Sequence, residues 1–421
     1  MRQIAGLVSI VILSSTAYAD NWAHWRGPTG NGVAMNSTPP TEWTSTKNIK
    51  WKVAVPGKGA GSPIIWGNRV FITTAVPEGA SGKGGLATLQ FKLLCYDRND
   101  GKLIWEQTAT KAKPHQETHA TNGFASASPC TDGERVYAHF GSRGLFCYTL
   151  DGKLVWKRDD FGKMDTLNRF GEGSSPTLAG NKILVPWDHQ GPSALYALDK
   201  LTGKTIWKEV REEPTCWATP LVVDNGGQKQ VVMNGQNFAR SYDLETGKEL
   251  WRCSGQTKRP VASAVAANGI VYVASGFQGA FIGAFLPSGK GDIKGTNQVV
   301  WTIDHDAPDI ASPLLTTTGR LYFHKGKSGQ LSCVDAATGK PHYVAKRVEG
   351  VDSTYGSPIE AGGHVYLTGR SGNIVVIKDS DELTVVSNNP MDEILDATPA
   401  PVDSELFVRG DQHLFCISNK K

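Results

Sequence analysis

The chain has 421 residues, with 44 Lys or Arg against 40 Asp or Glu, so its formal net charge is only +4. This near balance, without a polybasic run, argues against nucleic-acid binding and against docking on a membrane surface. Since 421 residues exceed the usual size of a domain with one core, we expect a chain built from repeats that pack only on their neighbours.

Residues 1–19 have the features of a cleavable signal peptide. Arg2 is followed by an apolar run over residues 4–13 and by small residues that end at Ala19. The apolar run is too short to span a bilayer, and a buried first strand is the alternative interpretation. We therefore expect cleavage after Ala19, no membrane insertion, and a mature protein that is periplasmic or secreted.

Residues 20–47 are rich in Gly, Pro and Asn and predict an irregular N-terminal arm. Three tryptophans lie in it: Trp22, Trp25 and Trp43. We expect these side chains to pack the arm onto the rest of the molecule. Aromatic contacts to a ligand are the alternative interpretation.

From residue 48 onward, one phrase recurs: an apolar strand, a turn with Gly-Lys, and a tryptophan. It reads LLCYDRNDGKLIW up to Trp105 and returns with Trp156, Trp207 and Trp251. A longer hairpin ends at Trp301, and the next copy has Tyr343 in that position. Each copy has the pattern of a β-hairpin, and a period of roughly 40 to 50 residues is typical of β-propellers.

A second repeated feature precedes each hairpin and marks the start of a unit. It is a Ser or Thr followed by Pro, or once by Ala, and then by an apolar run; proline is tolerated at the first position of a strand. The eight hydroxyl residues are Ser62, Ser128, Ser175, Thr219, Ser263, Ser312, Ser357 and Thr398. Eight starts predict eight blades of four antiparallel strands each.

The last unit contains only three strands before the C-terminus. The missing fourth strand is found at the other end, in NIKWKVAV over residues 48–55, where Trp51 holds the position of the repeated tryptophan. We therefore predict that residues 48–421 form a single all-β, eight-bladed β-propeller, in which the N-terminal strand completes the last blade and removes an exposed edge.

Four of the seven cysteines share one position in the third strand of their units, so we expect small core residues rather than disulfide partners. These are Cys95, Cys147, Cys333 and Cys416. Whether Cys130, Cys216 or Cys253 form a disulfide is left open by the sequence.

Functional residues are expected on one face of the ring, around the axis. In a four-stranded blade, the connection from the last strand to the next blade shares a face with the connection between the second and third strands. The charged and aromatic residues in these connections are His119, Asn122, Arg169, Glu172, Trp187, Asp188, His189, Trp217, Arg259, Asp309, Tyr355 and Asp396. A funnel with such side chains is suited to a small molecule or a peptide. Ordinary loop residues that bind turn amides are the alternative.

The repeated phrase resembles the tryptophan motif of the PQQ-like, or quinoprotein-type, β-propeller repeat family. In that family the tryptophan packs between blades. The matching residues here are Trp51, Trp105, Trp156, Trp207, Trp251 and Trp301. The resemblance covers about residues 48–418 and is nearest to exported bacterial PQQ-like and BamB-like repeat proteins, some of which begin with an arm like Trp25-Arg26-Gly27-Pro28.

The resemblance implies two kinds of function. Our leading hypothesis is a monomeric, non-enzymatic scaffold without a cofactor, which binds a protein, peptide or glycan ligand. The alternative is a dehydrogenase with pyrroloquinoline quinone (PQQ) and calcium, in which Trp217 stacks on the quinone and Asp309 or Asp396 acts as base. The adjacent cysteine pair of that branch is absent from this sequence. A hydrolase or lyase that uses residues such as His119 and Asp188 is a third hypothesis.

Overall fold

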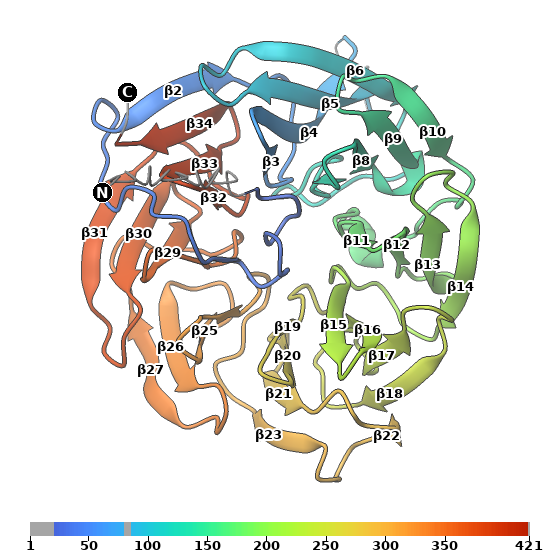
Figure 1. The fold of residues 1–421 in the computed structure, drawn as a ribbon, viewed down its shortest axis with the longest axis vertical. Coiled ribbons are helices and arrows are strands. Elements are labelled where there is room, and N and C mark those ends of the chain that lie inside the picture. The colour runs from blue at the N-terminus through green and yellow to red at the C-terminus, as the bar shows by residue number, and fades with distance from the viewer. Residues whose placement is uncertain (1–20, 80–85, 420–421) are drawn as a thin grey trace, which may run out of the picture.

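The computed structural model describes residues 21–79 and 86–419, so the predicted signal peptide lies outside the described residues. The chain forms eight sheets arranged in a ring, and each sheet contains one blade of four antiparallel strands (Figure 1). The strands of a blade are named A to D from the axis outward. In the described part of the chain no helix is long and apolar enough to cross a membrane.

The first four blades follow the order of the chain, from strand A to strand D. Blade 1 contains β3 (Ile64–Trp66), β4 (Arg69–Pro77), β5 (Leu89–Asp97) and β6 (Leu103–Ala112). Blade 2 contains β7 (Cys130–Thr131), β8 (Arg135–His139), β9 (Leu145–Thr149) and β10 (Leu154–Arg158). Blade 3 contains β11 (Thr177–Ala179), β12 (Lys182–Trp187), β13 (Ser193–Asp199) and β14 (Thr205–Arg211). Blade 4 contains β15 (Leu221–Asn225), β16 (Gln228–Met233), β17 (Ala239–Asp243) and β18 (Glu249–Cys253).

The next three blades repeat this order. Blade 5 contains β19 (Val265–Ala267), β20 (Ile270–Ser275), β21 (Phe281–Phe285) and β23 (Val299–Ile303). Blade 6 contains β24 (Leu314–Leu315), β25 (Arg320–His324), β26 (Gln330–Asp335) and β27 (Pro341–Arg347). Blade 7 contains β28 (Ile359–Ala361), β29 (His364–Gly369), β30 (Asn373–Lys378) and β31 (Val385–Pro390).

Blade 8 closes the ring as the sequence predicts. It takes β32 (Ala400–Val402), β33 (Glu405–Arg409) and β34 (His413–Ser418) from the C-terminus and β2 (Ile49–Ala54) from the N-terminal region. In the antiparallel pair of β2 and β34, Trp51 lies opposite Cys416. The same pairing of Cys and Trp recurs in blades 1 and 2. The predicted eight-bladed fold and its closure are therefore confirmed.

A ring of hydroxyl groups joins the blades around the axis. At each blade start the backbone N–H donates to the side-chain oxygen at the start of the next blade, over 2.8–3.1 Å. The last bond runs from the N–H of Thr398 to the Oγ of Ser62, so the circle is complete. We call these eight residues, which are the predicted blade starts, the hydroxyl ring. A buried N–H needs a partner, and here each partner lies on the neighbouring blade.

The repeated tryptophans link the blades at the outer rim. The indole N–H of Trp105 donates to the carbonyl of Leu150 on the next blade, at 3.0 Å. Its ring covers Gly152, whose φ of +84° and lack of a side chain suit the turn, because an added Cβ would lie 2.9 Å from the indole. The same donation to the next blade is made by Trp51, Trp156, Trp207 and Trp301. The Gly-Lys turn and the tryptophan are thus two halves of one contact between blades.

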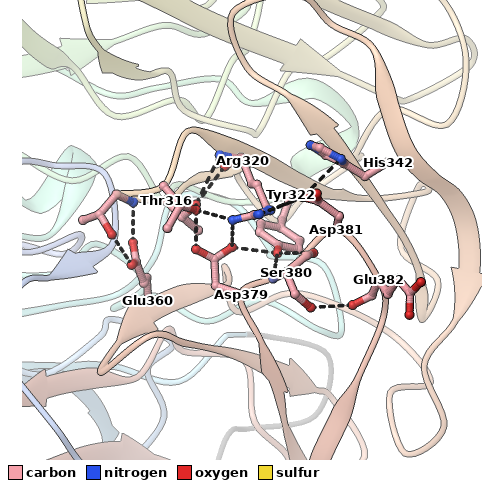
Figure 2. A network of polar contacts seen from close by, with 11 residues as sticks. Thr316, Arg320, Tyr322, His342, Glu360, Asp379, Ser380, Asp381 and Glu382 are labelled. Carbon is pink, nitrogen blue, oxygen red and sulfur yellow. Dashed lines mark hydrogen bonds and ion pairs between the residues drawn. The ribbon is translucent and has the colours of Figure 1, made fainter.

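Two junctions depart from this pattern. Trp251 bonds instead to Gln230 of its own blade, and the short strand β22 (Gly291–Asp292) from the long hairpin of blade 5 pairs with the outer edge of β18. Between blades 6 and 7 a polar network takes over (Figure 2). There the hydroxyl of Tyr322 donates to Asp379 at 2.8 Å, and Arg320 is paired with Asp381.

All seven cysteines are free and buried, including Cys130, Cys216 and Cys253, so the described residues contain no disulfide. Burial raises the pKa of Cys95 to about 12, which keeps the thiol protonated and unreactive. The four cysteines that share a strand position are therefore core residues, as expected.

The N-terminal arm closes the ring on the face of the A–B turns. Figure 1 shows this arm, in dark blue, running over the centre of the ring. Trp22 and Trp43 are buried, and β1 (Val33–Ala34) pairs with β28. Hydrogen bonds connect the arm to seven blades, through Ile65, Thr131, Pro176, Ala266, Pro313, Glu360 and Thr398. The arm is therefore an ordered plug at one end of the central channel.

Candidate functional site

A cavity of about 390 Å³ lies on the axis, which we call the funnel. Its upper wall is formed by loops on the face opposite the arm, and members of the hydroxyl ring surround its lower part. Trp25, which reaches the axis from the arm, lies at the bottom and donates its indole N–H to Thr398. The arm therefore closes the funnel at its bottom, and the mouth lies on the face of the D–A and B–C connections.

Five aromatic side chains line the funnel: Trp25, Phe170, Trp217, Phe277 and Tyr355. Trp217 is fixed by an indole hydrogen bond to the carbonyl of Gly171 at 2.7 Å and by its backbone N–H, which donates to Pro260. Such held aromatic surfaces provide apolar contact area with little loss of side-chain freedom on binding.

Arg259 forms a charged edge of the funnel. Its guanidinium lies 3.4 Å from the ring centroid of Phe277 and 3.2 Å from a carboxylate oxygen of Asp309. Arg259 and Asp309 are both more than nine-tenths buried, and Arg259 Nε and Asp309 Oδ1 have no hydrogen-bond partner among the described residues. Lys327 lines the same wall and lies 3.9 Å from Asp309.

Asp396 lies on the other side of the funnel, held by Arg370. The carboxylate accepts two hydrogen bonds from the guanidinium, at 2.7 and 3.4 Å. Burial raises the pKa of Asp396, and Arg370 opposes that rise. Because its oxygens are engaged, Asp396 is positioned as one half of an ion pair rather than as a free base.

Six of the twelve predicted site residues line the funnel: His119, Asn122, Trp217, Arg259, Tyr355 and Asp396. His119, Thr121 and Tyr355 form a short chain of hydrogen bonds, at 2.8 and 3.1 Å, which connects loops that precede blades 2 and 7. Asn122 bonds to Ser126 and to the carbonyl of Phe170. The structure thus brings together residues from five different loops.

The other six predicted residues do not line the funnel, and most of them are engaged by other partners. Asp188 is locked to Arg211 at 2.8 Å in a fully buried ion pair, and Trp187 packs on Phe161. His189 accepts backbone N–H bonds, and burial lowers its pKa.

Glu172, Asp309 and Arg169 complete this group. Glu172 accepts two hydrogen bonds from Ser142, and burial raises its pKa. Asp309 sits behind Arg259, and Arg169 is exposed, with a φ of +54°.

A smaller cavity of about 110 Å³ adjoins the funnel and shares Thr121, Asn122 and Asp396 with it. We call it the side pocket. Its charged residues are Lys58, Arg370, Arg409, Asp396 and Asp411. Sequence reasoning did not identify Lys58, Arg370, Arg409 or Asp411, nor Phe170, Phe277 and Lys327 of the funnel. No repeated motif marks them, and several come from B–C connections of single blades.

The carboxylates around the funnel are not grouped as a calcium ion would need. Calcium takes six to eight oxygen ligands, several of them carboxylate oxygens. In residues 21–79 and 86–419, no three His, Cys, Asp or Glu side chains are grouped so that they could hold a metal ion. The carboxylates near the funnel, Asp309 and Asp396, are engaged by Arg259 and Arg370.

Comparison with known proteins shows to which family this chain belongs. The model of the family described as outer membrane protein assembly factor BamB matches residues 41–158, 89–297 and 289–389. Tetrathionate hydrolase of Acidithiobacillus ferrooxidans is 24% identical over 370 residues, 77% of this chain and 65% of that protein. Outer membrane protein assembly factor BamB of Alkalilimnicola ehrlichii is 25% identical over 167 residues, 39% of this chain and 36% of that protein. The matched regions thus span less than two thirds of either relative.

Solved structures share the fold. BamB from Moraxella catarrhalis has a TM-score of 0.60 at 14% identity, and the match covers 88% of this chain and 99% of that one. Quinohemoprotein alcohol dehydrogenase from Comamonas testosteroni has a TM-score of 0.63 at 11% identity, with 95% and 81% covered. At such identities the likeness concerns the fold alone, and a fold does not determine a function.

Proposed function

The chain belongs to the family described as outer membrane protein assembly factor BamB, and from that premise we propose that it is a non-enzymatic binding scaffold. The protein is exported to the periplasm or secreted, acts as a monomer, and holds a protein, peptide or glycan ligand in the funnel. The features of residues 1–19 support export.

The funnel is the observation that carries this proposal. Aromatic side chains on its wall and floor offer stacking surfaces, and the hydroxyl ring and Asn122 offer hydrogen bonds. Pockets that combine apolar walls with a few fixed polar groups are typical ligand sites. The engaged state of Asp396 favours binding over proton transfer, because both of its carboxylate oxygens accept hydrogen bonds from Arg370.

Ligand screening with a variant of the funnel wall tests the scaffold. The full chain is applied to peptide and glycan arrays. Ligands that bind should lose at least about tenfold in affinity with Trp217→Ala, because a central aromatic anchor is removed. Trp217→Phe, which keeps a ring, should retain most of the affinity. Val210→Ser, at an exposed position on the outer strand β14, is the control. Ligands that bind Trp217→Ala as well as the unmodified chain would refute the funnel as the site.

Enzymatic alternatives are tested by turnover. The scaffold predicts no stoichiometric uptake of PQQ in the presence of calcium, and no dye reduction on addition of an alcohol. One relative's name also makes tetrathionate a candidate substrate, and the cations Arg259 and Lys327 in the funnel favour an anion of this kind. Incubation with tetrathionate should leave its concentration unchanged. If the protein turns over the alcohol or tetrathionate, and Asp396→Asn abolishes that turnover, the non-enzymatic scaffold is contradicted.

A further inference from the structure

We propose that the side pocket is an oxyanion seat, which takes a carboxylate, sulfate or phosphate group of the ligand bound in the funnel. This inference rests on the proposed function and specifies that its protein, peptide or glycan ligand carries an anionic group. Thr121, Asn122 and Asp396 line both the side pocket and the funnel, so the two cavities are neighbours. A ligand in the funnel that extends past these three residues would reach the side pocket.

The main observation is that Arg409, at the end of β33, is buried beside the side pocket without a carboxylate partner. It lines the side pocket and is 2% exposed, and one of its terminal nitrogens donates to the carbonyl of Thr73 on blade 1. Its Nε has no hydrogen-bond partner, and it forms no ion pair with any residue in 21–79 or 86–419. Burial lowers the pKa of Arg409 to about 10. A buried guanidinium without a carboxylate is costly, and an anion in the pocket would supply the missing partner.

Other buried arginines of this chain do have such partners. Arg98 is paired with Glu405 at 2.6 Å, and Arg211 is paired with Asp188 at 2.8 Å. Arg26 also has no carboxylate, but it donates to the carbonyls of Asn31 and Pro313 and lines neither the funnel nor the side pocket. Arg409 therefore combines an unpaired buried charge with a cavity beside it.

The surroundings of Arg409 fit a small anion. A Cβ on Gly59 would lie 2.8 Å from a terminal nitrogen of Arg409, so this glycine leaves room for the guanidinium at the pocket wall. Arg370 is neutralised by Asp396, which leaves Arg409 and the exposed Lys58 as the cations that face an anion. Asp411 is the opposing charge. Guanidinium groups bind carboxylate, sulfate and phosphate through matched hydrogen bonds.

Calorimetric titration with small oxyanions tests the seat. Sodium sulfate, sodium phosphate and sodium acetate are titrated separately into the full chain, with sodium chloride holding the ionic strength constant. We expect saturable binding of at least one anion with one site per chain. The anion that binds best identifies the group that the pocket selects.

Three variants assign this binding to the side pocket. Arg409→Gln keeps a donor for the carbonyl of Thr73 and should weaken anion binding at least about tenfold. Asp411→Asn changes an exposed residue that should not affect folding, and should tighten binding several-fold because it removes a repelling charge. Arg320→Gln, in the network of Figure 2 on the opposite face, should leave anion affinity unchanged.

The outcomes separate this inference from the scaffold itself. Absence of saturable binding for all three anions, or binding that neither Arg409→Gln nor Asp411→Asn alters, overturns the oxyanion seat. If array ligands still depend on Trp217 in that case, the scaffold stands alone. If sulfate binding depends on Arg409 while no array ligand depends on Trp217, the seat stands and the scaffold proposal fails.

Discussion

Single hydroxyl groups join the blades of this protein, one at the start of each blade. Each accepts a hydrogen bond from a buried N–H of the preceding blade, so the loss of one oxygen leaves a buried donor without a partner. An unsatisfied buried donor costs more than the net contribution of an average hydrogen bond. The stability of the ring is therefore expected to depend on these small polar residues as well as on the apolar core.

Substitution of one hydroxyl tests this dependence. Ser312→Ala removes the acceptor of the Ser263 N–H and should lower the free energy of unfolding by about 1–3 kcal/mol in urea denaturation. Ser312→Thr should cost less, because Thr219 and Thr398 already occupy equivalent positions. Ser288→Ala, on an exposed hairpin, should stay within about 0.5 kcal/mol. Equal effects of Ser312→Ala and Ser288→Ala would contradict the role of the ring.

A buried histidine makes the stability depend on pH. His324 is 1% exposed, its ring nitrogens have no partner among the described residues, and burial lowers its pKa from 6.5 to about 4. Between these two values the unfolded chain binds a proton that the folded chain does not. The contribution of His324 to the free energy of unfolding is therefore constant above pH 6.5 and becomes less favourable as the pH decreases toward 4.

The pH dependence of unfolding checks this assignment. His324→Leu should reduce the slope of the unfolding free energy between pH 6.5 and 4 by about 1.4 kcal/mol per pH unit. Leu321→Val, at another buried position of the same strand, removes no titrating group and should leave the slope unchanged. An unaltered slope in His324→Leu would show that this ring titrates equally in both states.

At the residue scale, the sequence predicted part of the site. His119, Asn122 and Trp217 were found because they precede blade starts, and loops at such positions meet around the axis. The sequence carries no sign of the direction of a side chain within a loop, so Asp188 and Trp187 were included although neither lines the funnel. Arg409 was missed because a strand residue gives no sign that its partner is absent.

At the scale of elements, the D-strand tryptophan and the Gly-Lys turn of the next blade form one unit. The contact requires a positive φ and the absence of a side chain in the turn, and the sequence therefore repeats a glycine and a tryptophan together. The same reasoning explains the junction between blades 6 and 7. There the turn after β30 has no Gly-Lys pair, Tyr343 replaces tryptophan, and Tyr322 bonds to Asp379 instead (Figure 2).

Two glycines with similar backbone but different surroundings test this unit. In Gly152→Ala the new Cβ would lie 2.9 Å from the indole of Trp105, whereas Gly180, with a φ of +62°, has nothing within 4 Å. Both alanines bear a cost for the left-handed conformation. Gly152→Ala should lose about 1–3 kcal/mol more than Gly180→Ala in denaturant unfolding. Similar losses would show that the indole does not restrict the turn.

In the whole molecule, two parts of the N-terminal region close the propeller: one completes the ring of blades, and the other covers one end of the central channel. The strand β2 completes blade 8, which the sequence predicts from the missing fourth strand of the last unit. The plug formed by residues 21–47 could not be predicted in the same way, because its contacts with seven blades follow no repeat. Its tryptophans were expected to pack the arm, and Trp22 and Trp43 do so, whereas Trp25 also forms the floor of the funnel.

Separate substitutions of two arm tryptophans distinguish packing from ligand contact. Trp22→Ala should lower the free energy of unfolding by about 3–5 kcal/mol, because a fully buried indole leaves a cavity. Trp25→Ala should cost less stability, since Trp25 is half-buried, but should weaken ligands that reach the funnel floor. Thermal unfolding and array binding report the two effects. Unchanged ligand affinity in Trp25→Ala would show that ligands bind near the mouth of the funnel and do not reach its floor.

Ligands are expected to enter the funnel through its mouth on the face of the D–A and B–C connections. Since all seven native cysteines are buried, a new surface cysteine can be modified selectively. Lys327→Cys, at the funnel wall, and Lys204→Cys, in an exposed turn on the opposite face, are each labelled with a bulky maleimide and tested against the array ligands. Labelled Lys327→Cys should lose binding, whereas labelled Lys204→Cys should keep it. Full binding by labelled Lys327→Cys would show that ligands do not enter through this mouth.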